Sequence, residues 1–233
     1  LKAEYDRILS TASIDVMVQG VDEARVADLL LRKLEGIRRD PQPFALPMAM
    51  PRTPLRHFKE EIPGLTQAKL CMLFTRGTPE DLPSITVMRM AMSVFGGSTT
   101  SRLFRNVREK QSLCYYCSSS YDSIKGIMYI NSGVEGENLE KAEKAILKEI
   151  EDMKNGEITD FEIEATKLAV VNSFKSSSDS VSGIENWYTG RIFNGDLETV
   201  EEVSAEVNAV TKEQIVNAAN KLLLDTVYVL KNK

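Results

Sequence analysis

The residues best suited to chemistry in this chain gather in one stretch, residues 95–121, with the sequence FGGSTTSRLFRNVREKQSLCYYCSSSY. The stretch opens on Gly96-Gly97, and the hydroxyl residues after it, ending at Ser101, suit a helix N-cap. Apolar residues then recur at helical spacing among basic ones, which predicts a short amphipathic helix. The expected inward residues are Leu103, Phe104 and Val107, and the basic ones are Arg102, Arg105, Arg108 and Lys110. From Leu113 to Tyr121 the aromatic and hydroxyl residues favour a strand.

Arg108 and Tyr115 are the pair that this arrangement singles out. Arg108 falls on the last turn of the expected helix, and Tyr115 falls on the strand that follows it. A guanidinium and a phenol both donate hydrogen bonds to carbonyl oxygens, so together they could orient a peptide or stabilise a developing oxyanion. The alternative is structural: Arg108 would balance the dipole at the helix C-terminus, and Tyr115 would pack in the core. The residue pattern by itself leaves both interpretations open.

Three cysteines, Cys71, Cys114 and Cys117, are an odd and low number, which fits a reducing compartment. Cys114 and Cys117 form a C-x-x-C motif, for which redox or metal chemistry is one interpretation. On a regular strand, however, residues three apart point to opposite faces, so we expect the two thiols not to share a metal or a disulfide. Both are interpreted as small core residues.

A single histidine, His57, restricts the hydrolytic chemistry that this chain can perform. A zinc site of the H-x-x-E-H type needs two histidines on one helical face, and Ser-His or Cys-His catalysis would have to use His57 without a nucleophile motif. The glycine pair is not followed by Gly-Lys-Ser/Thr, so a P-loop is excluded. We expect no self-sufficient catalytic site, no activity of the chain alone and no stoichiometrically bound zinc.

Composition predicts an ordinary globular protein. Hydrophobic residues make up 42% and charged residues 27%, and 29 basic against 34 acidic residues give a net charge of −5. This mildly acidic balance argues against nucleic acid as a partner. No apolar run approaches the length of a membrane span and no signal peptide is visible, so the expected location is cytoplasmic. Because the sequence begins at Leu1 rather than Met, we expect it to be a fragment.

Periodicity and proline content divide the chain after residue 54. Residues 1–54 are predicted to be a β-α piece, with a strand over Ile14–Gly20 and a helix over Val21–Leu34, and then a proline-rich connector from Gly36 to Pro54. Residues 55–233 are predicted to form the main domain. Strands are expected over 57–62, 66–76, 113–121, 126–134 and 227–230, and helices over 78–95, 138–153, 159–172, 184–193, 197–207 and 212–224.

This order of elements favours an α+β fold. Neighbouring strands form hairpins more often than β-α-β units, which predicts a two-layer sandwich: a mostly antiparallel sheet with helices packed on one face. The long helix from Thr159 is expected to turn Phe161, Ala165, Leu168 and Ala169 inward. The serine-rich stretch from Ser173 to Gly183 fits either a loosened helix or a mobile link.

The motif stretch resembles the second, zinc-free domain of the insulinase/pitrilysin-like peptidases, which include the mitochondrial processing peptidases. The pattern in that family is a Gly pair, then Ser-Arg-Leu-Phe, then Arg-Glu-Lys, then Leu-x-Tyr. All four elements occur here, at Gly96-Gly97, Ser101–Phe104, Arg108–Lys110 and Leu113–Tyr115. The resemblance covers nearly the whole chain. The serine-rich sequence that follows is most similar to bacterial members whose own chain lacks the zinc motif.

The resemblance implies a division of roles between two domains that face each other across a chamber. One domain carries zinc and H-x-x-E-H, and the other supplies an Arg and a Tyr that reach the substrate backbone, which correspond to Arg108 and Tyr115. The residues that would support the motif are Gly96, Gly97, Ser101 and Arg102. The implied function is peptide binding opposite a zinc-bearing domain or sister subunit, in a homo- or heterodimer. The alternative is a scaffold subunit of the same fold with no peptidase role.

Overall fold

The structure, a computed structural model, describes residues 1–20, 22–42, 49, 54–77 and 83–233. Its described strands form one sheet in the order β1-β5-β2-β4-β3. They are β1 (Arg56–Glu61), β2 (Ala68–Thr75), β3 (Cys114–Asp122), β4 (Ile127–Val134) and β5 (Leu223–Lys231). β1 runs parallel to β5, and the pairings β5-β2, β2-β4 and β4-β3 are antiparallel. The mostly antiparallel sheet predicted from the sequence is confirmed.

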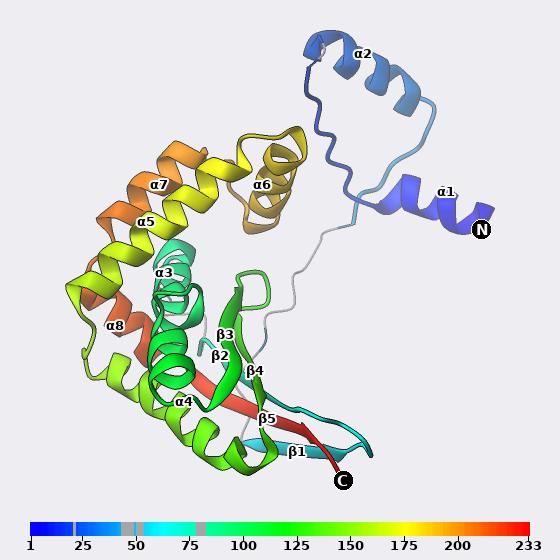
Figure 1. The fold of residues 1–233 in the computed structure, drawn as a ribbon. Coiled ribbons are helices and arrows are strands. Elements are labelled where there is room, and N and C mark those ends of the chain that lie inside the picture. Colours follow the sequence, from blue (N-terminus) through cyan, green and yellow to red (C-terminus); the bar gives the residue numbers. More distant parts are fainter. Residues whose placement is uncertain (21, 43–48, 50–53, 78–82) are drawn as a thin grey trace.

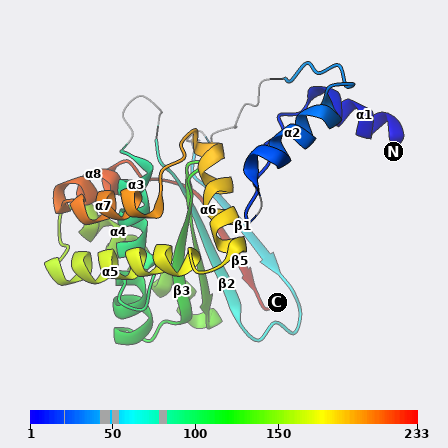
Figure 2. The same cartoon turned by 90° about the horizontal axis from the view of Figure 1, so that it is seen from above.

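Helices cover one face of this sheet, as Figures 1 and 2 show from two directions. They are α3 (Ile85–Gly96), α4 (Leu139–Lys154), α5 (Asp160–Ser177), α6 (Val181–Asn194), α7 (Val200–Ala209) and α8 (Lys212–Asn220). A π-helix, η2 (Leu103–Lys110), and a 3₁₀ turn, η3 (Gly136–Asn138), complete this part of the chain. α3 packs against β3 and also against α5, α7 and α8, so it lies at the centre of the helix layer. The predicted two-layer α+β sandwich is therefore confirmed.

The core lies between α3 and the sheet because alternate residues of β2 point toward the helices. The buried residues on this side of the strand are Ala68, Leu70, Met72 and Phe74. Leu70, Met72 and Phe74 belong to one cluster with the fully buried methionines of α3, Met88 and Met90, and with Ile146 of α4. The methionines fill core space as expected for flexible apolar side chains.

Helix boundaries follow local capping chemistry, which the sequence predicted only in part. Capping boxes begin α5, α7 and α8, at Thr159/Glu162, Thr199/Glu202 and Thr211/Gln214. The helix start expected at residues 78–81 lies outside the described residues, and α3 begins at Ile85, where the Ser84 side chain accepts a hydrogen bond from Val87 N. α8 ends at Asn220, so residues 223 and 224, predicted as helix, belong to β5 instead.

The inward face of α5 differs from the prediction. Phe161 and Leu168 are 61% and 64% exposed, whereas Ile163, Thr166 and Val171 are buried. Apolar residues occur almost all round this helix, so its spacing alone could not identify the buried side. α5 extends to Ser177, and α6 begins at Val181 after a short turn, so the serine-rich stretch is mainly helical.

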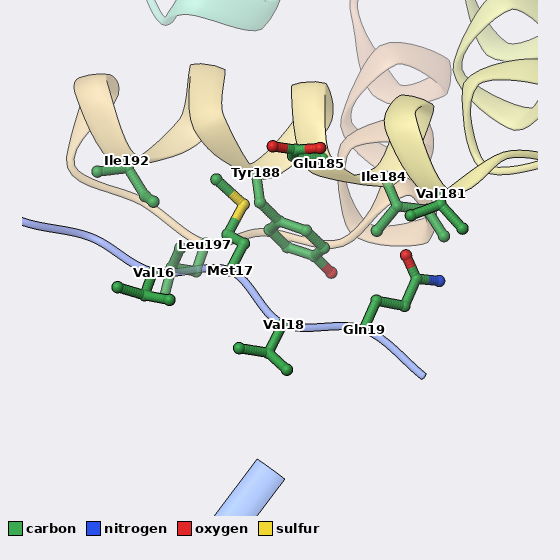
Figure 3. A pocket seen from close by; sticks show the side chains of 10 residues that line it. All are labelled: Val16, Met17, Val18, Gln19, Val181, Ile184, Glu185, Tyr188, Ile192 and Leu197. Carbon is green, nitrogen blue, oxygen red and sulfur yellow. The ribbon is translucent and has the colours of Figure 1, made fainter. Parts of the chain in front are cut away.

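The strand predicted over Ile14–Gly20 is not present. The segment is extended but pairs with no described strand, and it crosses α6 with a cavity of about 580 Å³ between them. Met17 reaches toward the helix while Val18 points away from it (Figure 3). A strand needs neighbours for its backbone N–H and C=O groups, and alternation of side chains does not supply them.

The N-terminal helices stand apart from the two-layer body (Figure 1). They are α1 (Lys2–Thr11) and α2 (Glu23–Leu34), and neither buries any side chain. The predicted helix over Val21–Leu34 thus corresponds to α2. Most of the proline-rich connector lies outside the described residues, and the domain boundary at residue 54 stays a prediction. No helix of the described part is long and apolar enough to cross a membrane.

Arg102 joins three helices of the body through a buried charge cluster. It is 6% exposed, and its guanidinium lies 2.8 Å from Glu149 of α4 and 3.4 Å from Glu162 of α5. It also donates a hydrogen bond to the main-chain oxygen of Glu157 and lies 3.8 Å from Asp152. Because Arg102 immediately precedes η2, this cluster fixes the start of η2 against α4 and α5.

Replacing Arg102 with Met should destabilise the fold strongly. The change keeps an apolar side chain of similar length but leaves Glu149 and Glu162 buried without their cation. Removing one partner of a buried ion pair typically costs about 3–5 kcal/mol of unfolding free energy. Urea unfolding would measure the loss, with Arg105→Met, at an exposed position within η2, as the control. Equal stability of the two variants would contradict the assigned role of the cluster.

Candidate functional site

A cavity of about 340 Å³ lies where the C-terminus of α3, the helix η2 and the edge strand β3 meet. We call it the η2–β3 pocket. Its lining includes Gly96, Gly97, Phe104, Arg108, Tyr115 and Tyr116. The structure thus brings together four of the six residues that the motif singled out. The other two, Ser101 and Arg102, are buried and are not among the lining residues.

Gly96 allows α3 to end directly against β3. A Cβ at this position would lie 2.6 Å from Ser119 N and 2.8 Å from a methyl group of Leu103, closer than real Cβ atoms approach such atoms. Ser119 reinforces the contact, because its hydroxyl donates a 2.9 Å hydrogen bond to the main-chain oxygen of Met92. The glycine pair is therefore needed for close packing, and it leaves this wall of the pocket without side chains.

The turn from α3 into η2 is held by its own hydroxyl groups. Ser101 Oγ donates to the main-chain oxygen of Ser98, and Ser98 Oγ accepts from Thr100 N. No side chain of this turn caps η2, contrary to the expectation from the four hydroxyl residues. η2 is also a π-helix where the sequence period predicted an α-helix; π-helical turns are frequent at functional sites.

A β-bulge at Tyr115 determines which side chains reach the pocket. Cys114 pairs with Val134 and Tyr116 with Gly133, so Tyr115 has no partner on β4. The extra residue turns both tyrosines outward, with Tyr115 56% exposed. The structural alternative in which Tyr115 packs in the core is therefore wrong.

The same bulge corrects the prediction for the C-x-x-C motif. Cys114 and Cys117 do not point to opposite faces, because the bulge adds one residue and both thiols are buried on one side. They are free thiols that share a hydrogen bond. That bond and then burial raise the pKa of Cys117, whereas accepting the bond lowers the pKa of Cys114 to about 7. Their interpretation as core residues holds, although the expected geometry does not.

Arg108 is fixed by the backbone of the bulge rather than by the tyrosine hydroxyl. Its Nε donates a 2.9 Å hydrogen bond to the main-chain oxygen of Tyr115, and its guanidinium lies 4.4 Å from the ring centre of Phe104. Nη1 lies 3.3 Å from the exposed carboxylate of Glu109. The guanidinium is thus held by the hydrogen bond from Nε and by the Phe104 ring against its face. Its Nη2 has no hydrogen-bond partner among the described residues.

The Tyr115 hydroxyl has a partner that the sequence reasoning missed. It donates a 2.5 Å hydrogen bond to Glu135 Oε1, and this bond raises the pKa of Tyr115 above that of an ordinary tyrosine. The phenol therefore keeps its proton throughout the neutral pH range. The hairpin register offered the signal: Glu135 follows Val134, which pairs with Cys114, the residue before Tyr115.

Among the described residues, no three or more His, Cys, Asp or Glu side chains form a group that could hold a metal ion. His57 lies on β1, at the opposite edge of the sheet from β3. The site therefore offers a guanidinium, a protonated phenol and an open glycine wall, which suits binding and charge stabilisation.

Comparison with known proteins places this geometry in a family. Residues 1–170 match the peptidase M16 inactive domain. A curated relative from Bacillus subtilis (strain 168), "Probable inactive metalloprotease YmfF", is 36% identical over 154 residues, which is 66% of this chain and 35% of that protein. The chain thus spans about a third of the length of this relative.

Solved structures show the same fold. A conserved protein from Enterococcus faecalis V583 has a TM-score of 0.80 at 30% identity, over 91% of this chain and 50% of that one. A peptidase M16 inactive domain from Pseudomonas fluorescens has a TM-score of 0.73 at 22% identity, over 91% of this chain and 52% of that one. Because the Pseudomonas fluorescens domain is only 22% identical, its similarity shows the fold alone.

Gly96→Ala should destabilise the chain, because the new methyl group would press on the backbone of β3. Overpacking of this kind typically costs about 1–3 kcal/mol. The matched control is Gly190→Ala on α6, where a Cβ meets nothing within 4 Å and should stabilise the helix by about 0.5–1 kcal/mol. Thermal unfolding should show a lower unfolding temperature for Gly96→Ala and a higher one for Gly190→Ala. A neutral Gly96→Ala would mean that α3 and β3 do not meet as described.

Proposed function

Because the chain belongs to the peptidase M16 family, as one of its inactive domains, we propose that it clamps peptide substrate opposite a zinc-bearing domain. Membership confirms the resemblance to insulinase/pitrilysin-like peptidases that the motif indicated. Clamping would take place in the η2–β3 pocket. The observation that carries the proposal is the bulge, which exposes Tyr115 beside an Arg108 guanidinium fixed in place by the same bulge.

The pocket suits a peptide backbone better than a compact ligand. Arg108 keeps Nη2 for a substrate carbonyl, and the Gly96-Gly97 wall has no side chain to hold a peptide away. β3 is an edge strand, and an extended peptide can add to such an edge through main-chain hydrogen bonds. All three features recognise main-chain atoms and would tolerate many side chains.

Zinc, in this proposal, belongs to another domain or subunit. This chain has one histidine, at the far edge of the sheet from the pocket, so it cannot supply the two histidines of an H-x-x-E-H site. Zinc in such peptidases polarises the scissile carbonyl and activates water. Arg108 and Tyr115 would orient the peptide and stabilise charge on its carbonyl oxygen. A homo- or heterodimer in the cytoplasm is the expected setting.

One observation favours a second candidate, the scaffold subunit. The Tyr115 hydroxyl already donates to Glu135, so its proton is engaged in this conformation. A clamp must release that bond, or use the hydroxyl oxygen as an acceptor, when peptide binds. A scaffold needs neither change, because the Tyr115–Glu135 bond would simply fasten the bulge.

Turnover in the assembled enzyme distinguishes the two candidates. With a zinc-bearing M16 partner present, Arg108→Ala and Tyr115→Phe should each lower kcat by about a hundredfold, as loss of a preorganised donor does. Tyr129→Phe, which removes a hydroxyl from an exposed tyrosine on β4, should leave kcat unchanged.

Complex formation and unfolding temperature should stay near wild type in all three variants, because Arg108 is half-buried and both tyrosines are exposed. If the Arg108→Ala and Tyr115→Phe variants cleave peptide as fast as the wild type, the chain is a scaffold subunit. A large drop in unfolding temperature for Tyr115→Phe alone would instead assign the hydroxyl to a structural bond.

A further inference from the structure

A second, smaller cavity of about 220 Å³ lies on the other side of the Gly97-Ser98 turn, between α3 and α5. We call it the Arg89 pocket. Its lining is rich in groups that donate hydrogen bonds, and it includes Arg89, Ser93, Ser98, Thr166, Ser173 and Phe174. Among the described residues, none that lines it carries a carboxylate.

Arg89 contributes a positive charge that the described residues leave unpaired. Its guanidinium lies 5.5 Å from the ring centre of Phe174 and has no carboxylate within ion-pair distance in the described part of the chain. The neighbouring Arg191 is neutralised by Asp196 and Glu198, each 2.7 Å away. Burial and then repulsion from Arg191 lower the pKa of Arg89, so an anion there would relieve both effects.

Thr166 adds an unmet hydrogen-bonding group. The residue is 1% exposed, and its hydroxyl has no hydrogen-bond partner among the described residues. A buried polar atom without a partner is unfavourable by about 1–3 kcal/mol, so such atoms are rare in folded proteins. In a cavity that also contains an unpaired guanidinium, a ligand is the simplest partner for it.

We propose that the Arg89 pocket binds a small tetrahedral oxyanion of the phosphate class. The guanidinium fork can engage two oxygens, and single hydroxyl donors such as Thr166 can engage the others. A planar carboxylate presents its two oxygens in the plane of the fork, whereas a tetrahedral anion also presents oxygens outside that plane, where a second donor such as Thr166 can reach them. The cavity is smaller than those that hold drug-sized ligands, which also fits a compact anion.

The chain contains its own reporter for this site. Trp187, its one tryptophan, contacts Phe174 edge to face with ring centres 5.0 Å apart, and Phe174 lies under Arg89. An anion that engages Arg89 should therefore change tryptophan fluorescence. The experiment titrates the 233-residue chain with inorganic phosphate at constant ionic strength, with acetate and phosphoserine as parallel probes.

We expect saturable phosphate binding that weakens at least tenfold in Arg89→Gln and in Thr166→Val. Thr166→Ser, which keeps the hydroxyl, should restore binding, and this rescue separates a lost donor from a damaged fold. The matched control is Arg105→Gln, which removes an arginine stacked on Phe161 outside the pocket at 5.4 Å and should bind phosphate normally.

Three results would overturn the proposal: no saturable phosphate binding, equal binding by Arg89→Gln and Arg105→Gln, or acetate binding as tight as phosphate. Tighter binding of phosphoserine than of phosphate would support the site and identify a phosphorylated side chain as the source of the anion. Tighter binding of free phosphate would support it with the inorganic ion as the source.

Discussion

The buried guanidinium of Arg102 is the interaction on which the functional end of this fold depends. It gathers carboxylates from α4 and α5 around the start of η2, the helix that carries Arg108. A buried charge is tolerated only with such partners, so the three helices have little freedom to move apart. Gly96 acts on the other side of η2, where it lets α3 end against β3. Together these two contacts fix the walls of the η2–β3 pocket.

Much of the fold follows from patterns that are local in sequence. The strands expected over 66–76, 113–121 and 126–134 and the long helix from Thr159 each depend on neighbouring residues, and each prediction was confirmed. The failures involve partners far away in sequence. The extended segment at Ile14–Gly20 has a strand pattern but no strand beside it, and the buried side of α5 is chosen by α3 and α7.

The sequence predicted which residues form the candidate site but not the hydrogen bonds that they make. Arg108 and Tyr115 do come together, yet through the main-chain oxygen of Tyr115, while the hydroxyl binds Glu135. Both differences arise from the bulge, which shifts the side chains by one position along β3. A bulge is decided by pairing across the sheet, so alternation along one strand could not reveal it. For the same reason the two thiols share a face.

The central claim is that an inactive M16 domain contributes to peptide cleavage by holding the peptide backbone at the bulge. A structure of this chain assembled with a zinc-bearing M16 domain and an uncleaved peptide tests it most directly. The account predicts an extended peptide beside β3, with a main-chain oxygen within hydrogen-bond distance of Arg108 and with the Tyr115 hydroxyl turned from Glu135 toward the peptide. A peptide bound without contact to either side chain, with the Tyr115–Glu135 bond intact, would contradict it.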